Sequence, residues 1–302
     1  GAGVSIEEVN DRDEAFGYAD RFDEKIDHVR TLRKGNMKYI RNYQPFNVDA
    51  LFNEYRYRML AYAEWWELYR AGSLNAIQQQ FFEPRPAEQL FDLSDDPFET
   101  RDLANDPAYA DLLSAMRQEL NSKVKSINDL SMFPESMLFA EAFDDPVAFG
   151  RQNSARIGQL VDIADLSLQS LDDVTGDVVT ALESDDPWVR YWGLIVLSSF
   201  GEEAHSFAEI ARRMATEDEE NLVRVRAAEF LGLIQAENPA SYLIDALLNA
   251  NNEMEAVIIL NTIVLLQDFF GYQIAVSPDL IPSQWQSNGQ SNLTLRLDHL
   301  NN

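Results

Sequence analysis

The sequence predicts an α+β region with a small antiparallel sheet, followed by an all-α solenoid of stacked helices. Two strand-like runs flank the turn residues at 34–36, and a third short run at 89–93 ends before an Asp-Asp-Pro sequence. From about residue 166, apolar residues instead recur at helical spacing, and similar segments return 34 residues later. This change of period along the chain predicts two structural classes in one protein.

The composition is that of a globular protein with room for about two domains. The chain has 302 residues, of which 46% are hydrophobic, including 17 Phe, 11 Tyr and 5 Trp. It contains no cysteine, which excludes disulfides, cysteine-based zinc sites and a thiol nucleophile, but suits both cytosol and periplasm. Packed hydrophobic cores must therefore hold the fold together.

The charge balance excludes some classes of partner. With 51 acidic and 24 basic residues the formal net charge is −27, and such a field repels the phosphate backbone of nucleic acids. No apolar run approaches the roughly 20 residues that span a bilayer. We therefore expect neither nucleic acid nor a membrane as a partner. The start, GAGVSIEE, has no initiating Met and no signal-peptide pattern, so we expect residue 1 to lie inside a longer protein.

The first region is expected to begin with a loop at residues 1–20 and then to become basic. Nine of the 24 basic residues fall between positions 21 and 58. Within this stretch, the runs 28–33 and 37–43 predict a β-hairpin, because the intervening turn residues tolerate a positive φ. Alternation places Met37, Tyr39, Arg41 and Tyr43 on one face and Lys38, Ile40 and Asn42 on the other. A basic hairpin of this kind usually faces water and balances nearby carboxylates.

Residues 55–69 predict a helix with an aromatic stripe. The stripe consists of residues at spacings of three and four, namely Tyr55, Met59, Tyr62, Trp66 and Tyr69. We expect it to pack in the core, with a carbohydrate platform at Trp65 and Trp66 as the alternative. The prolines in residues 81–87 exclude a helix there, so the chain reaches the third strand in an extended conformation.

An acidic turn and a helix follow the strand at 89–93. Asp106 supplies a capping oxygen, and Pro107 has the φ angle of a first helical residue. Apolar residues then repeat at helical spacing towards a helix end near Lys125: Tyr109, Leu112, Leu113, Met116 and Leu120. Residues 1–130 therefore form the α+β region, and residues 131–165, which have no clean period, form a packed connector.

Residues 166–270 predict a helical repeat array. A helix opened by Asp185-Asp186-Pro187 carries Val189-Arg190, and Val223-Arg224 follows 34 residues later. Each of these helices follows another apolar-striped helix, and neither helix of a pair can bury its stripe alone. The Asp-Pro turn and the Val-Arg pair resemble HEAT repeats. Residues 271–302 are rich in Gln, Ser and Asn, and we expect an irregular C-terminal tail there.

Three short motifs in the first region resemble the C-terminal subdomain of sulfatases. Residues 88–93 read EQLFDL, 96–99 read DPFE and 102–104 read DLA, where the family has Glu-Leu-Tyr-Asp-Leu, Asp-Pro-x-Glu and Asn-Leu-Ala. Phe91 and Asp102 depart from the usual tyrosine and asparagine, and neither replaces a catalytic group. The preceding hairpin, VRTLRKGNMKYIRNY, is similar to the heparan N-sulfatase (N-sulfoglucosamine sulfohydrolase) type within the arylsulfatase family.

The resemblance implies sulfate hydrolysis by groups outside this chain. A sulfatase uses an aldehyde nucleophile made from the Cys or Ser of a Cys/Ser-x-Pro-x-Arg motif. It also uses a carboxylate-bound cation, usually calcium, that holds the sulfate oxygens. The motif does not occur in the sequence. The resemblance places the nucleophile and the Ca²⁺ ligands in an upstream domain, so we expect the chain alone to be inactive.

The residues indicate no independent catalytic set. His28, His205 and His299 are far apart and lack zinc-type spacing. No Gly-x-Ser-x-Gly sequence supports a serine triad, and the abundance of carboxylates makes any glycosidase pair an arbitrary choice. We therefore assign no catalytic residue and no metal ligand to this chain.

The resemblance does imply substrate contacts. In the family, the polypeptide passes the edge of the substrate pocket just before the hairpin, where Arg21, Asp23 and Glu24 lie here. Arg33 and Lys38 are second choices within the hairpin. A guanidinium binds sulfate through two hydrogen bonds, and carboxylates accept hydrogen bonds from sugar hydroxyls. The alternative is a salt-bridge cluster on the surface.

The predicted function is therefore that of the C-terminal part of a sulfatase that removes sulfate from a sulfated glycan. The resemblance suggests a periplasmic or secreted protein. The rival interpretation is a non-catalytic module whose HEAT-like repeats bind a protein partner.

Overall fold

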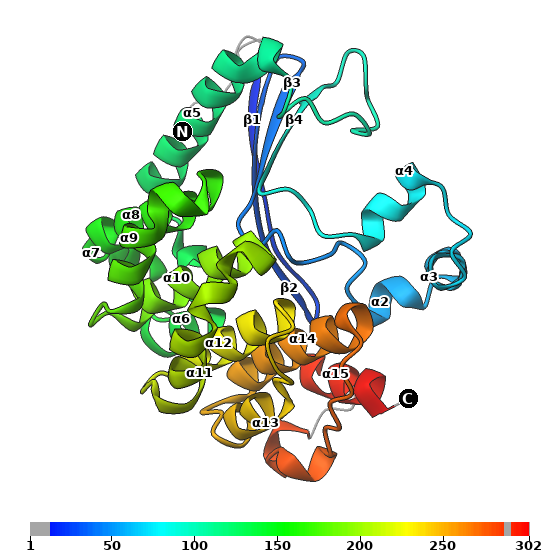
Figure 1. Cartoon of the computed structure of the whole chain (residues 1–302), viewed down its shortest axis with the longest axis vertical. Coiled ribbons are helices and arrows are strands. Elements are labelled where there is room, and N and C mark those ends of the chain that lie inside the picture. The colour runs from blue at the N-terminus through cyan, green and yellow to red at the C-terminus, as the bar shows by residue number, and fades with distance from the viewer. Residues whose placement is uncertain (1–12, 287–290, 302) are drawn as a thin grey trace.

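The computed structural model describes residues 13–286 and 291–301 and contains a four-stranded sheet beside a large helical region (Figure 1). The strands are β1 (Glu14–Phe22), β2 (Lys25–Lys34), β3 (Met37–Asn42) and β4 (Glu88–Asp92), antiparallel in that order. The α-helices are α2 (Glu54–Tyr57), α3 (Leu60–Arg70), α4 (Ala76–Gln79), α5 (Ala110–Ser126), α6 (Glu135–Glu141), α7 (Pro146–Gln152), α8 (Ser154–Ala164), α9 (Leu171–Leu182), α10 (Pro187–Phe200), α11 (Ala208–Glu217), α12 (Asn221–Leu233), α13 (Ala240–Leu248), α14 (Glu253–Phe270) and α15 (Asn292–Asn301). The elements have the composition expected of an α+β protein.

The hairpin of β2 and β3 and the strand β4 are where the sequence predicted them. Gly35 has a φ of +57° in the turn, and Lys34 pairs with Met37 directly across it. The predicted helix after β4 is also present, because Asp106 accepts a hydrogen bond from the backbone N–H of Ala108 at 3.0 Å just before α5. These local turn and cap residues determine the element boundaries.

β1 is a strand where the sequence predicted a loop. Residues 1–12 of the predicted loop lie outside the described residues, but residues 14–22 pair along β2. Gly17 permits this pairing, because a Cβ there would lie 2.6 Å from Oγ1 of Thr31. A register shift between Ala19 and Arg21 interrupts the ladder at Asp20. The prediction was wrong because β1 takes its conformation from β2, not from an apolar alternation of its own.

The two faces of the sheet differ. On one face, Leu32, Tyr39 and Leu90 lie side by side and are almost fully buried, and α5 packs against β2 and β3 there. The same face carries the buried Arg30 and Arg41. The opposite face carries alternating polar and apolar side chains and is only partly covered by the segment that contains α2–α4 (Figure 1).

The helix predicted over residues 55–69 is broken into α2 and α3. Met59 has extended backbone angles between them. No residue of α3 is fully buried, and its aromatic side chains pack in a small separate cluster around Phe82. Trp65 stacks on Phe81 with ring centroids 4.6 Å apart. The expected core helix is therefore a half-exposed aromatic layer.

Residues 131–165 are largely helical, where the sequence suggested an irregular connector. Asp145 accepts a hydrogen bond from the N–H of Ala148 at 2.9 Å and begins α7, and Pro146 is the first residue of that helix. Ile157 of α8 is fully buried in a cluster that extends from Leu32 to Leu297. The division into residues 1–130, 131–165, 166–270 and 271–302 stays a prediction.

Helices α9–α14 pack in pairs. α9 contacts α10, α11 contacts α12 and α13 contacts α14, while α12 also contacts both α10 and α14. Val189 and Val223 are both buried at equivalent positions of α10 and α12. The described residues therefore form stacked helix pairs, and their classification as HEAT-like repeats stays a prediction. None of the described helices combines the length and hydropathy that crossing a membrane requires.

An arginine recurs every 34 residues on three helices of this region. The ion pairs are Arg156–Asp186, Arg190–Asp218 and Arg224–Asp245, with N–O distances of 2.5, 2.7 and 3.4 Å. We call these three pairs the arginine ladder. Arg156 belongs to α8, so the ladder begins before the repeat array that the sequence predicted.

The predicted irregular tail contains α15, which is anchored to the sheet. Arg296 is fully buried, and its guanidinium donates to the carbonyl oxygens of Phe52 at 2.8 Å and Glu24 at 3.0 Å. It also donates to Oδ1 of Asn261 at 2.9 Å, which accepts a second hydrogen bond from the N–H of Ile26 at 3.0 Å. Polar contacts therefore attach α14 and α15 to the β1–β2 turn.

Candidate functional site

The five predicted substrate-binding residues lie in two groups at opposite ends of the sheet. Arg21, Asp23 and Glu24 are at the β1–β2 turn, where Arg21 pairs with Ile26. Arg33 and Lys38 pair with each other near the β2–β3 turn. On β2, Arg33 lies seven positions after Ile26, the strand partner of Arg21, which corresponds to roughly 23 Å along a strand. A single sugar unit therefore reaches only one group.

Arg21 lies where the sheet meets the helical region. Its Nε donates to the backbone oxygen of Asp23 at 2.6 Å, and its Nη1 forms an ion pair with Glu135 of α6. The same Nη1 is 2.9 Å from Sδ of Met254 on α14. Its side chain keeps about a fifth of its surface exposed, so a ligand can reach it.

The two carboxylates beside Arg21 have different environments. Asp23 is exposed in the turn with a φ of +51°. Glu24 is fully buried and accepts hydrogen bonds from Nδ2 of Asn53 at 3.3 Å and from the N–H of Glu54 at 2.5 Å. The Glu24 carboxylate therefore stabilises the start of α2, and Asp23 is the accessible carboxylate of the two.

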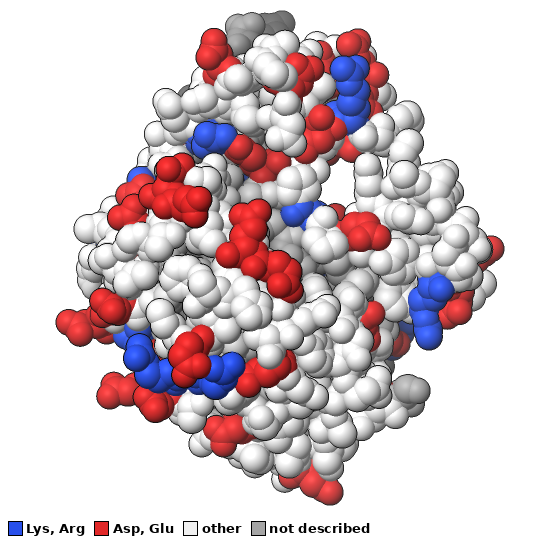
Figure 2. All heavy atoms as spheres, viewed as in Figure 1, with Lys and Arg blue, Asp and Glu red and all other residues white. Residues whose placement is uncertain are grey.

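The hairpin cations also have protein partners. The Arg33 guanidinium lies 3.7 Å from a carboxylate oxygen of Asp13, and Nζ of Lys38 is 2.6 Å from a carboxylate oxygen of Glu99. Each of the other basic residues at positions 21–58 also forms an ion pair with an acidic side chain, except Arg56. Arg56 contacts a backbone oxygen and aromatic rings instead. On the face shown in Figure 2, basic side chains likewise lie beside acidic ones. The basic stretch is thus not a free positive patch.

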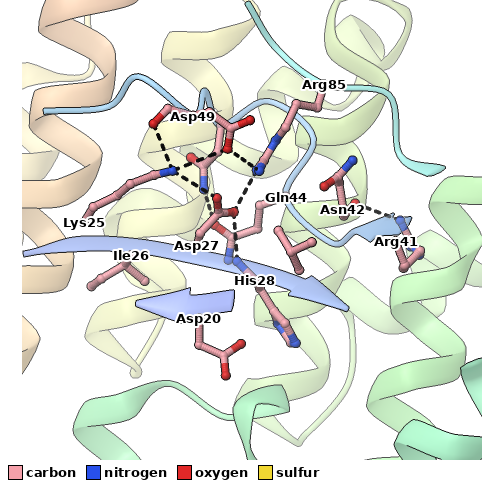
Figure 3. Close-up of polar contacts among 12 residues, drawn as sticks. Asp20, Lys25, Ile26, Asp27, His28, Arg41, Asn42, Gln44, Asp49 and Arg85 are labelled. Carbon is pink, nitrogen blue, oxygen red and sulfur yellow. Dashed lines mark hydrogen bonds and ion pairs between the residues drawn. The ribbon is translucent and has the colours of Figure 1, made fainter. Parts of the chain in front are cut away.

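Four charged side chains meet on the partly open face of the sheet (Figure 3). Asp27 of β2 lies 2.8 Å from Nη2 of Arg85 and 3.3 Å from Nζ of Lys25. Asp49 lies 3.1 Å from Arg85 and 3.7 Å from Lys25. Burial alone would raise the pKa of Asp27, but the charges of Arg85 and Lys25 hold it well below its usual range. The Asp27 carboxylate is therefore ionised at all ordinary pH values.

The Asp27 cluster forms the wall of an open groove of about 660 Å³ that also includes Arg21, Lys38 and Arg56. We call it the sheet groove. It runs along the face of β1–β3, so it connects one residue of each predicted substrate-binding group. Its volume falls within the roughly 300–1,000 Å³ typical of ligand pockets.

A second hollow lies on the other side of β2, and we call it the His28 cavity. It has a volume of about 250 Å³ and is lined by residues of β1, β2, α6, α10 and α12, including Asp20, Arg21, His28, Trp192 and Arg226. Figure 3 shows the His28 ring and the Asp20 carboxylate on the side of β2 away from the Asp27 cluster. Arg21 and Asp20 line both the cavity and the sheet groove.

His28 is neutral at physiological pH. Burial lowers the pKa of its imidazole to about 4, and the nearby Arg30 guanidinium acts in the same direction, while Asp20, Asp129 and Asp27 oppose it. The ring lies 4.5 Å from the Tyr43 ring, centroid to centroid. Its Nε2 is buried and has no hydrogen-bond partner among the described residues.

Sequence reasoning missed the Asp27 cluster and the His28 cavity. Asp27 and Arg85 are 58 residues apart and meet only because β3 and its following loop return the chain to β2. The alternation in β2 could have placed Lys25 and Asp27 on one face and His28 on the other. Across residues 13–286 and 291–301, no group of three or more Asp, Glu, His or Cys residues is arranged to hold a metal ion.

Part of the chain is similar to a known sulfatase. The chain is 42% identical over 121 residues to an ulvan-active sulfatase of Formosa agariphila. The aligned part makes up 40% of this chain and 20% of that protein, so the chain spans only a small part of its relative. No family model matches. The similarity supports a sulfatase-related C-terminal part in this chain.

Proposed function

We propose that this chain is the C-terminal part of a sulfatase that hydrolyses sulfate from a sulfated glycan. The observation that supports it most is the 42% identity over 121 residues to a sulfatase active on ulvan. The motifs at residues 88–104 agree with it, since β4 and the turn after it have the strand and loop structure that the resemblance implies. The finer proposal is a heparan N-sulfatase-like enzyme.

In this proposal the chain binds and orients the glycan and does not cleave it. The aldehyde nucleophile and Ca²⁺ would be held by residues upstream of Gly1, where the cation would stabilise charge on the sulfate oxygens. Arg21 and Asp23 would contact the glycan at the β1–β2 turn, because both are accessible beside the sheet groove. Arg33 and Lys38 would act on a more distant unit of the same glycan.

Arg21 and Asp23 would perform complementary tasks. The Arg21 guanidinium can donate two hydrogen bonds to a sulfate group, in exchange for its ion pair with Glu135. The Asp23 carboxylate can accept a hydrogen bond from a sugar hydroxyl. Glu24 would act indirectly by fixing the turn, because its carboxylate is buried against Asn53 and Glu54.

A non-catalytic module that binds a protein through the helical repeats is the second proposal. The stacked pairs α9–α14 and the arginine ladder support it, because repeat arrays present extended surfaces to partners. The coding sequence upstream of Gly1 separates the two proposals. An open frame with a Cys/Ser-x-Pro-x-Arg motif supports the enzyme, and its absence supports the module.

The enzymatic test compares two lengths of the protein with ulvan and with N-sulfated heparan as substrates. The purified 302-residue chain with Ca²⁺ should release no sulfate, whereas the protein extended through the upstream region should release it. Removal of Ca²⁺ by a chelator should abolish release by the longer protein. Sulfate release by the 302-residue chain, abolished by a substitution within it, would contradict the proposed division of labour.

A further inference from the structure

The His28 cavity is a built site and not a packing defect. Its inner wall is formed by buried side chains, among them His28, Trp192 and Arg226, and its outer rim by half-buried ones such as Ser131 and Leu138. Buried polar atoms are nearly always hydrogen-bonded, so an unpartnered imidazole nitrogen at the wall indicates a missing partner. A cavity that holds a single water needs a volume of only about 15 Å³. The His28 cavity has a volume of about 250 Å³, so it has room for a larger molecule.

The charges around the cavity are already balanced. Arg21 is paired with Glu135, and Arg226 lies 2.5 Å from Glu229. Asp20 is paired with Arg30 of β2. A charged ligand in this cavity would compete with one of these pairs, whereas a neutral ligand leaves all three intact. The wall therefore favours an uncharged molecule.

The remaining hydrogen-bonding groups fit hydroxyls. The carboxylate of Asp20 accepts from Oγ of Ser131 at 2.9 Å and from both terminal nitrogens of Arg30, and it retains one of its roughly four acceptor positions, on Oδ1. The Nε2 atom of His28 donates in one tautomer and accepts in the other, and a hydroxyl group satisfies either. Trp192 and Phe133 supply aromatic surface, on which the apolar face of a sugar ring can pack.

We propose that the His28 cavity binds a neutral, polyhydroxylated ring of the size of one unsulfated sugar unit. The ring hydroxyls bond to Nε2 of His28 and to the Asp20 carboxylate, and the ring packs against Trp192. The site lies between the sheet and the helices α6, α10 and α12, so its ligand also holds these elements together. This inference does not depend on sulfatase chemistry, because no sulfate contact is part of it.

The test uses the 302-residue chain and three neutral probes, namely D-glucose, D-galactose and D-xylose, with D-glucuronate and D-glucosamine as charged comparators. Saturation-transfer NMR should detect at least one neutral probe and neither charged one. The same probe should shift the imidazole resonances of His28 and leave those of His205 and His299 unchanged. Unchanged His28 resonances with every neutral probe would show that the cavity holds water only and would overturn the proposal.

A matched pair of variants locates the binding. Leu138→Trp fills the rim of the cavity, and Leu112→Trp adds the same side chain to an exposed position on α5. Leu138→Trp should weaken binding at least about tenfold, whereas Leu112→Trp should leave it unchanged. Equal binding by both variants, or tighter binding of a charged comparator, would overturn the proposal. The result is separate from the sulfatase assay, because the 302-residue chain need not turn over substrate.

Discussion

The sheet and the helical array bury their charges in different ways. Arg30 and Arg41 lie inside the layer between the sheet and the helices and are at most 2% exposed. Arg30 bonds to Asp129 at 2.6 and 2.9 Å, and Arg41 to Asp165 at 3.1 Å. In the array, by contrast, apolar side chains fill the space between the helices. The arginine ladder of the array is partly exposed. The sheet is thus held in place by specific ion pairs and the array by apolar packing.

One buried ion pair interrupts the apolar array, at the place where it meets the sheet. Arg226 and Glu229 are both almost fully buried, and Arg226 also donates to the Tyr191 hydroxyl at 2.7 Å. The Oγ1 of Thr262 donates to Glu229 at 2.9 Å. Arg226 and Tyr191 line the His28 cavity. The Arg226–Glu229 pair therefore lies at the junction of the two regions.

The largest expected effect comes from placing a charge in the array. Val189→Asp buries an unpaired carboxylate between α9 and α10 and should lower the free energy of unfolding by about 4 kcal/mol. Val147→Asp, at an exposed position of α7, should change it by less than about 0.5 kcal/mol. Urea unfolding followed by circular dichroism measures both. A loss below about 1 kcal/mol for Val189→Asp would show that the array tolerates charge.

The Val189→Asp variant also tests the predicted domain boundaries. If residues 1–130 fold separately from the array, limited proteolysis should cut between 131 and 165 and release a stable sheet fragment. If the core cluster that extends from Leu32 to Leu297 unfolds as one unit, no protected fragment should appear. The two outcomes are distinguished by mass spectrometry of the products.

A somewhat smaller loss is expected from removing a buried arginine of the sheet. Arg30→Met leaves Asp129 without its partner in a buried place and should cost about 3 kcal/mol. Adding Asp129→Leu should recover part of that loss, because the double variant removes the buried carboxylate and leaves only the half-buried Asp20 without its partner. Arg33→Met, on the exposed end of β2, serves as the control and should have almost no effect. Equal losses for Arg30→Met and Arg33→Met would contradict the account of the sheet.

Acid should weaken the sheet region before the array. The pKa of His28 falls from about 6.5 in the unfolded chain to about 4 in the folded protein, so the unfolded chain binds more protons between these values. The corresponding stability is present above pH 6.5 and is lost as the pH falls to 4, by about 2 to 3 kcal/mol. Hydrogen-exchange protection factors, which correct for the pH dependence of intrinsic exchange, should fall between pH 6.5 and 4 more at β2 than at α12 of the array, and His28→Gln should remove this difference. Equal protection factors for β2 at both pH values in the unsubstituted protein would contradict it.

Local patterns in the sequence were enough to predict the hairpin, β4, α5 and the helix pairs. Each has a turn, a capping residue or an apolar period within its own segment, as Gly35 and Asp106 show. β1 and α15 were missed because their structure depends on partners far along the chain, namely β2 for the strand and the Arg296 contacts for the helix. α7 was missed although Asp145 and Pro146 mark its start.

The same reasoning explains what was missed at the candidate site. Arg21 and Asp23 could be singled out because a family resemblance placed the β1–β2 turn near a substrate. The role of Glu24 in stabilising the start of α2 could not be predicted, because its partner Asn53 lies 29 residues further along the chain. The unpartnered nitrogen of His28 is likewise a property of the cavity and has no trace in the local sequence.

The most direct test of the central claim compares one arginine from each region in the longer protein that we propose to hydrolyse a sulfated glycan. The claim is that the sheet region contacts the substrate and that the array supports it. Arg21→Ala should lower kcat/KM by about tenfold to a hundredfold through the loss of a charge-assisted contact, and Arg224→Ala, from the arginine ladder, should leave it unchanged. An unchanged kcat/KM for Arg21→Ala together with a lowered value for Arg224→Ala would contradict the claim.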